Sequence, residues 1–109
     1  MTINVNHRGL ELTPAIRQYV EEKMESLQKY FESIRHIDVE VGIANGHHHK
    51  GDIFECKVVV QVGGETIQIA REAEDLYKAI DKVKDHLRME LTEWKKKLEE
   101  RSKSGGGAE

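Results

Sequence analysis

Two groups of side chains in this sequence could support metal or covalent chemistry: the run His47-His48-His49 and the single cysteine, Cys56. The three histidines follow one another in a loop that glycines flank. They lack the fixed spacing that a helix or paired strands give to metal ligands. Cys56 alternates with valines in a predicted strand, where a cysteine packs as a small apolar side chain. The sequence has no catalytic triad and no glycine-rich phosphate loop, so we predict no enzyme activity, metal or cofactor.

Cationic side chains offer a different chemistry, the binding of phosphate, and a long helix predicted over about 74–101 carries many of them. Its apolar positions recur every three or four residues from Leu76 to Leu98, which is one stripe of an amphipathic helix. The polar positions form two flanks beside this stripe. One flank carries Lys84, Arg88 and Lys95, and the other carries Lys78, Lys82 and His86 in line with Met89 and Glu93.

A second helix, predicted from Thr13-Pro14 to about Phe31, has a similar division. Thr13 can cap the helix, and Pro14 suits its first position. Tyr19, Lys23, Ser26 and Tyr30 share one flank, and Arg17 lies on the other. Charged helix faces are usually only solvated, so these residues alone leave RNA binding and simple solubility both open.

The remaining elements that must position these helices are strands. Apolar and polar residues alternate over 2–8, 36–43 and 54–62, and Gly63-Gly64 predicts a hairpin with a returning strand over 66–71. The order is β-α-β-β-β-α. We therefore predict an α+β fold in which a four-stranded sheet carries both helices on one face.

Length and composition predict one domain over 1–101 and a disordered tail over 102–109, where three glycines follow one another. No apolar run is long enough for a membrane span, and the N-terminus does not resemble a signal peptide. A single cysteine fits a cytoplasmic protein. The net charge of −3 argues mildly against nucleic-acid binding. Residues 75–109, however, carry nine Lys and Arg against eight Asp and Glu, and are the less acidic part.

The sequence resembles a known family from about residue 2 to residue 98. The segments that carry the resemblance are 9–20 (GLELTPAIRQYV), 62–65 (VGGE) and 75–81 (DLYKAID). In this order and spacing they are similar to the ribosome hibernation-promoting factors and ribosome-associated inhibitors, also called the sigma-54 modulation family. The resemblance implies a fold like a double-stranded-RNA-binding domain.

The resemblance also implies a function. Such proteins bind the small ribosomal subunit in the channel that holds messenger RNA and transfer RNA, and they keep ribosomes idle in stress or stationary phase. In the family, both helices present basic residues to ribosomal RNA, and Arg17 and Lys23 of this sequence match such positions. The residues that we expect to contact RNA are Arg17, Lys23, Lys78, Lys82, Lys84, His86, Arg88 and Lys95.

Three positions of the last helix depart from the family pattern. His86, Met89 and Glu93 stand where the family usually has cations. Because phosphate contacts dominate affinity, we expect weaker ribosome binding than the basic members show. The alternative is a protein-interaction module on the same fold that has lost RNA binding. A general binder of double-stranded RNA is a third hypothesis.

The length resembles that of a short form of the family, which lacks a second, dimerising domain. We expect a monomer that contacts no membrane, and any pairing of ribosomes would need another factor. The residues do not distinguish a protein that promotes pairing from one that holds single ribosomes inactive.

Overall fold

The computed structural model of this protein describes residues 2–44 and 53–108, with side chains described as far as Arg101. His47, His48 and His49 lie outside the described residues. Six elements follow one another in the order predicted from the sequence. Their bounds are β1 (Thr2–Arg8), α1 (Pro14–Tyr30), β2 (Ile34–Ile43), β3 (Phe54–Val62), β4 (Glu65–Ala73) and α2 (Leu76–Ala108).

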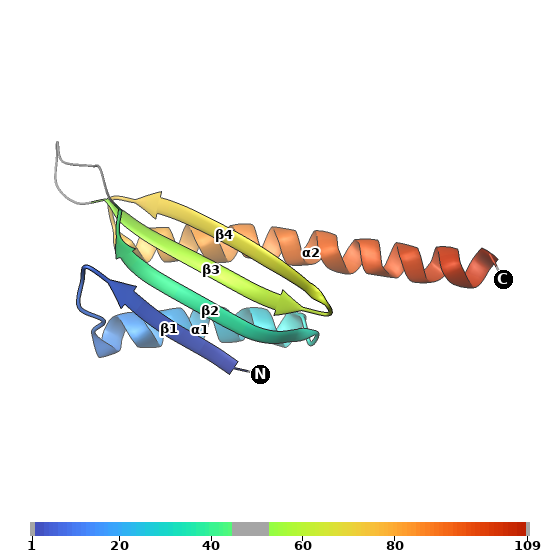
Figure 1. Ribbon diagram of the computed structural model, residues 1–109, viewed down its shortest axis with the longest axis horizontal. Helices are drawn as coiled ribbons and strands as arrows, with labels where there is room; N and C mark the ends of the chain where they lie inside the picture. Colours follow the sequence, from blue (N-terminus) through green and yellow to red (C-terminus); the bar gives the residue numbers. More distant parts are fainter. Residues whose placement is uncertain (1, 45–52, 109) are drawn as a thin grey trace.

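The four strands form one sheet in the order β1-β2-β3-β4 (Figure 1). β1 pairs with β2 in parallel, and the other two pairings are antiparallel. Val39 of β2 lies opposite Val5 of β1 and Val58 of β3, and Val58 lies opposite Ile69 of β4. All four of these side chains are buried. This row of apolar residues crosses the sheet on its helix-covered face, which explains the alternation in the sequence.

Both helices cover that one face of the sheet, as the sequence predicts (Figure 1). α1 packs on β1 and β2, whereas α2 packs on β3 and β4. Met24 and Leu27 of α1 and Ile80, Leu87 and Leu91 of α2 are almost completely buried between the layers. The apolar stripe of each helix therefore forms the core, and the flanks beside each stripe remain available to solvent or to a partner.

Local capping fixes where each helix begins. The side chain of Thr13 accepts a hydrogen bond from the backbone N–H of Ile16, and Pro14 follows it, which confirms the predicted helix start. The Asp75 carboxylate accepts a hydrogen bond from the N–H of Tyr77 at 2.8 Å. Because Asp75 caps α2, the helix begins at Leu76 rather than at the predicted Glu74.

The far end of α2 also differs from the sequence prediction. The helix continues to Ala108, past the end predicted at Arg101. No proline or capping motif stands at that position, so no local signal stops the helical backbone there. The division between a domain over 1–101 and a disordered tail over 102–109 stays a prediction. None of the helices that the structure describes is both long enough and apolar enough to cross a membrane.

The predicted hairpin between β3 and β4 contacts α2. Gly63 has a positive φ of 60°, the backbone conformation that glycine adopts without strain. A Cβ atom at this position would lie 2.7 Å from Cζ2 of Trp94. The indole Nε1 of Trp94 also donates a hydrogen bond to the Glu65 carboxylate at 2.8 Å. The turn therefore fixes the position of Trp94 where α2 leaves the sheet.

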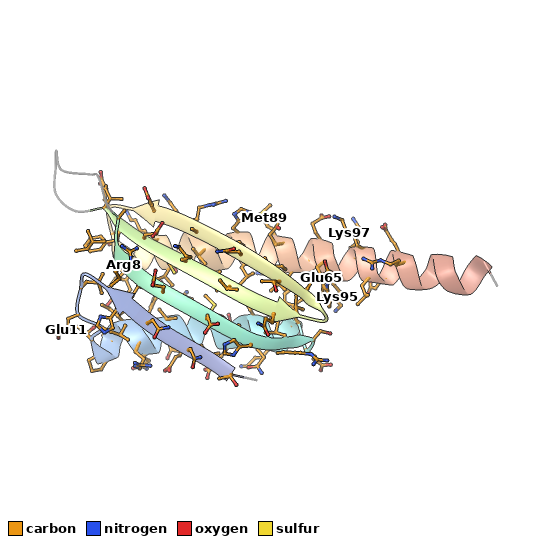
Figure 2. The ribbon with its side chains drawn as sticks, viewed as in Figure 1. Arg8, Glu11, Glu65, Met89, Lys95 and Lys97 are labelled. Atoms are coloured by element: carbon orange, nitrogen blue, oxygen red, sulfur yellow. The ribbon has the colours of Figure 1, made fainter. Side chains whose placement is uncertain are left out.

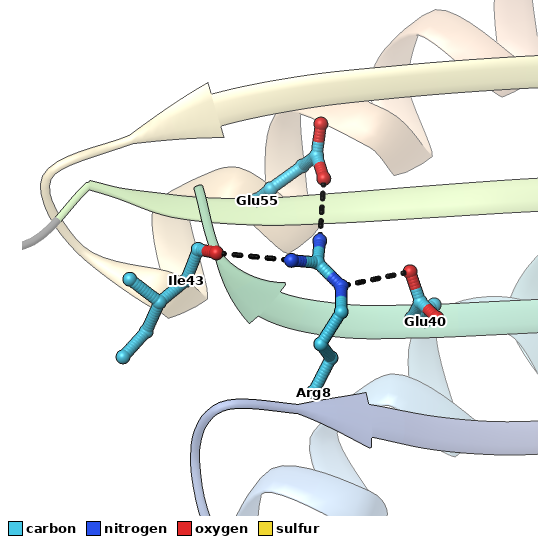
Figure 3. Close-up of polar contacts among 4 residues, drawn as sticks. All are labelled: Arg8, Glu40, Ile43 and Glu55. Carbon is cyan, nitrogen blue, oxygen red and sulfur yellow. Dashed lines mark hydrogen bonds and ion pairs between the residues drawn. The ribbon is translucent and has the colours of Figure 1, made fainter. Parts of the chain in front are cut away.

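Arg8 occupies the opposite, uncovered face of the sheet (Figure 3). Its guanidinium group donates to the Glu55 carboxylate at 3.1 Å and to the backbone carbonyl of Ile43 at 3.2 Å. Glu40 lies 3.6 Å from Nε of the same side chain. Gly42 passes beneath it, and a Cβ atom there would lie 2.9 Å from the Arg8 carbonyl oxygen. These contacts join the ends of three strands across the uncovered face.

Candidate nucleic-acid interface

The uncovered face of the sheet has the wrong charge for RNA. Asp38, Glu40 and Glu55 alternate with buried core residues and therefore point away from the helices. The cations Arg8 and Lys57 also lie on this face, and Arg8 already pairs with two of these carboxylates. An acidic surface repels phosphate, so the helices are the surface to examine for RNA contacts.

Three cations of α2 lie in a row on the side that faces α1. Lys84, Arg88 and Lys95 follow Asp81 at helical spacing, and Asp81 contacts α1 directly. Among the described residues, none of these three cations forms an ion pair. They span about 16 Å along the helix axis. Figure 2 shows Lys95 on the edge of α2 nearer α1, and Met89 and Lys97 on the other edge.

Lys23 of α1 lies on the same side of the molecule, where it meets Asp81 from α2. Its Nζ atom is 3.8 Å from the Asp81 carboxylate and 5.0 Å from the centre of the Tyr19 ring. Tyr19 and Tyr77 pack edge to face with their ring centres 4.9 Å apart. We call Lys23, Lys84, Arg88 and Lys95 the inter-helix cation row. These four residues are brought together from positions that are separated widely in the sequence.

Asp81 of α2 contacts both Tyr19 and Lys23 of α1. The Tyr19 hydroxyl donates a hydrogen bond of 2.6 Å to the Asp81 carboxylate. This hydrogen bond, with desolvation and the nearby negative charge, raises the pKa of Tyr19 to about 12. The tyrosine is therefore a neutral donor at physiological pH. Its bond to Asp81 links α1 to α2 and orients the Lys23 side chain.

Lys82 and His86 lie on the other side of α2, against β4. The Lys82 ammonium group donates to the backbone carbonyl of Glu72 at 3.1 Å. His86 contacts the Arg71 guanidinium through Nδ1, and its Nε2 atom is 4.0 Å from the Glu90 carboxylate. Both partners of His86 therefore lie on the β4 side of α2 or on α2 itself. Neither residue joins the inter-helix cation row.

The last two residues expected to bind RNA also stand apart from the row. Arg17 is half exposed near the start of α1, where it pairs with Glu21 at 3.9 Å. Lys78 is exposed on the surface of α2 that faces away from the sheet. The structure thus brings together four of the eight residues predicted from the sequence and separates Arg17, Lys78, Lys82 and His86 from them.

The part of the chain that the structure describes contains neither a reactive cysteine nor a metal site. Cys56 is buried in β3, as predicted, and burial raises the pKa of its thiol to about 12. A thiol with that pKa is a poor nucleophile because the thiolate is the reactive form. Across residues 2–44 and 53–101, no three His, Cys, Asp or Glu side chains gather in a way that could hold a metal ion.

Sequence reasoning missed Asp81 and Tyr30 as parts of this surface. Tyr30 ends α1 with 64% of its surface exposed, and the Arg88 guanidinium carbon lies 5.6 Å from its ring centre. The signal was present, because Tyr19, Lys23 and Tyr30 share one flank at helical spacing. What the sequence could not show is that this flank faces α2, since the two helices are adjacent only after the sheet has formed.

Known proteins with similar sequences carry names related to the ribosome. The ribosome hibernation promoting factor of Escherichia coli is 30% identical over 100 residues, which cover 92% of this chain and 99% of that protein. That of Azotobacter vinelandii is 31% identical over 101 residues, covering 93% of this chain and 89% of that protein. A relative from Picosynechococcus is 30% identical, and the match covers only 50% of its length.

Solved structures show the same fold. The N-terminal domain of Protein Y from Thermus thermophilus has a TM-score of 0.74 and 29% identity, covering 86% of this chain and 99% of that one. A ribosomal subunit interface protein from Coxiella burnetii has a TM-score of 0.76 and 25% identity, covering 87% of this chain and 98% of that one. The sequence also matches, over residues 3–99, the family described as Sigma 54 modulation protein / S30EA ribosomal protein. This chain therefore belongs to that family.

Proposed function

We propose that this protein is a ribosome hibernation factor. Membership of the family and the names of relatives that align over about nine tenths of the chain support this role. The fold agrees with that of a ribosomal subunit interface protein. The described part of the chain offers a charged helical surface rather than an enclosed catalytic site. A protein of this kind acts by occupying a position on the ribosome and needs no enzyme activity.

The observation that carries the binding mode is the inter-helix cation row, which four residues from two helices form on one side of the molecule. Lysines and arginines in such a row suit contacts to RNA phosphates, which position a protein on structured RNA without reading its bases. We infer that this row binds ribosomal RNA of the small subunit, in the channel that messenger RNA and transfer RNA otherwise fill. Occupation of the channel would block translation by steric exclusion.

Competition for the channel tests this proposal. Purified protein is sedimented with small ribosomal subunits that are either empty or already loaded with messenger RNA and transfer RNA. Empty subunits should bind the protein, and loaded subunits should release most of it, because the two occupants cannot share the channel. Equal binding to empty and loaded subunits would place the protein elsewhere on the subunit and contradict the proposal.

The same proposal covers the setting in which the protein acts. We infer that it works as a monomer in the cytoplasm, where ribosomes are idle under stress or in stationary phase. The homologous region fills only half of the longer Picosynechococcus relative. We further propose that any pairing of ribosomes depends on another factor.

A second candidate function is a protein-interaction module on the same fold, and the β4 side of α2 favours it. Met89 is 67% exposed there, on the same side as Glu90 and Glu93. This surface suits RNA less well than the inter-helix cation row does, because an apolar side chain and two carboxylates accompany its cations Lys82 and Lys97. Met89→Asp should weaken capture of a protein partner and leave sedimentation with small subunits unchanged. If subunit binding is absent from the wild-type protein, this second function takes precedence.

A further inference from the structure

Tyr30 presents an aromatic ring to solvent at the end of α1. Its side chain is 64% exposed, although a ring of this size usually contributes to a core. The Arg88 guanidinium group lies over this ring, with its central carbon 5.6 Å from the ring centre. Such a cation–π contact holds an exposed ring in one place without burying it.

Two adjoining hollows lie beside Tyr30, and the ring lines both. One hollow, of about 430 Å³, is lined by Tyr30 at the end of α1, by Phe31 directly after it, and by Trp94 and Leu98 from α2. The other, of about 510 Å³, contains Arg88. Trp94 is fixed by its hydrogen bond to Glu65 and by its close approach to Gly63. The site is therefore an aromatic surface whose parts are already positioned before any ligand arrives.

The charges around these hollows indicate what the surface binds. Four cations line them, against two carboxylates. The cations are Lys29, Arg88, Lys95 and Lys96, and the carboxylates are Glu32 and Glu99. A purely apolar ligand would gain nothing from the excess of cations. A nucleotide fits both features, because its base is flat and aromatic and its phosphate is negative.

We propose that Tyr30, supported by Arg88 and flanked by Trp94, is a stacking platform for one unpaired base of RNA. Proteins that bind single-stranded RNA commonly combine an aromatic ring with a cationic surface in this way. On the ribosome, the ligand would be a base of ribosomal RNA that is not stacked within an RNA helix. This identification of the ligand rests on the proposed function above. Lys29 and Lys95 would contact its phosphate. Stacking adds affinity that salt screens little, in contrast to the phosphate contacts of the inter-helix cation row.

Substitution of Tyr30 tests the platform, because an exposed position can change without unfolding the protein. Tyr30→Leu removes the aromatic face, whereas Tyr30→Phe keeps it and serves as the matched control. The dissociation constant for purified small subunits is measured across a salt series. The Leu variant should bind about 5- to 150-fold more weakly at every salt concentration, with an unchanged salt slope, and the Phe variant should match the wild type. Equal affinity of the Leu variant and the wild type would overturn the proposal.

A second measurement separates this proposal from the proposed function. Trp94 is the single tryptophan of the chain, so its fluorescence reports on the hollow that it lines. Single-stranded hexa-adenosine RNA should quench this emission in the wild type and in Tyr30→Phe, but not in Tyr30→Leu. If the protein fails to bind small subunits and quenching still occurs, the ribosomal role fails and the platform stands. If hexa-adenosine leaves the emission unchanged in the wild type, the platform is wrong.

Discussion

At the scale of single residues, Asp81 shows how a carboxylate can belong to the surface that we propose to bind RNA. Its negative charge opposes phosphate, yet it receives the Tyr19 hydroxyl and lies 3.8 Å from the Lys23 ammonium group. Without this partner, Lys23 would lose its fixed position between the two helices. The carboxylate therefore reduces the net charge of the site and in return orients one of its cations.

Two other side chains give the protein a predictable response to alkaline pH. Cys56 and Tyr19 both have a pKa raised to about 12 in the folded protein, above their ordinary values of 9.0 and 10.0. Between those values and 12, the unfolded chain releases protons that the folded chain retains. The free energy of unfolding should therefore fall as the pH rises above about 9. Urea unfolding at several pH values measures this loss.

Cys56→Ala provides the control for that measurement. The variant should be less stable at neutral pH, because it loses a buried side chain, but its stability should depend less steeply on pH above 9. A variant that lost stability with pH as steeply as the wild type would show that Cys56 does not contribute to the alkaline response.

The grouping of the candidate RNA contacts on the surface could not be predicted from the sequence. The eight candidate RNA contacts rest on charge, helical spacing and the family resemblance, which identify a flank of a helix but not the element that lies beside it. Lys82 and His86 turn toward β4, where a backbone carbonyl and Arg71 engage them. The strand that supplies these partners is close to α2 only in the folded molecule. Their separation from the inter-helix cation row could therefore not be predicted from the sequence.

At the scale of elements, the β3–β4 hairpin positions the last part of α2 that packs on the sheet. The turn leaves space for the Trp94 ring at Gly63, and Glu65 at the start of β4 accepts its hydrogen bond. α2 continues well past this contact (Figure 1). The hairpin therefore determines the direction in which the helix leaves the sheet, and with it the placement of Trp94 beside Tyr30.

Substitution of the two turn glycines should have different effects on stability. Gly63→Ala requires a positive φ for alanine and brings its Cβ atom against Trp94, so it should lower the free energy of unfolding by about 1–3 kcal/mol. Gly64→Ala meets nothing within 4 Å and should leave stability unchanged or raise it by up to about 1 kcal/mol. Denaturant unfolding of the two variants measures the difference. Equal stability of both variants would contradict this role for the hairpin.

The elements themselves were largely predictable from the sequence. Alternation identified the strands, Thr13-Pro14 identified the start of α1, and Gly63-Gly64 identified the hairpin. Each of these signals is local, so each can be read without knowledge of the fold. The end of α2 was not predicted correctly, because no local signal at Arg101 terminates the helix. The placement of both helices on one face followed from the element order and from their apolar stripes.

At the scale of the whole molecule, charge is separated between surfaces although the net charge is only −3. The uncovered face of the sheet is acidic. The inter-helix cation row lies on the opposite layer, where α1 and α2 lie next to each other. A protein with a negative net charge can therefore bind RNA through one surface. The acidic face would repel phosphate, so the protein would bind RNA in one orientation only.

The measurement that tests this account most directly is the salt dependence of small-subunit binding for two variants with the same net charge. Lys84→Gln combined with Lys95→Gln removes two cations from the inter-helix cation row. Lys78→Gln combined with Lys82→Gln removes two cations from elsewhere on α2. Sedimentation with small subunits across a salt series gives the slope of the logarithm of affinity against the logarithm of salt concentration for each variant and for the wild type.

The first variant should have a slope shallower than the wild type by about 2, because each phosphate contact contributes about 1. The second variant should keep the slope of the wild type. Equal slopes for the two variants, or a shallower slope for the second alone, would contradict the proposal that the inter-helix cation row binds ribosomal RNA.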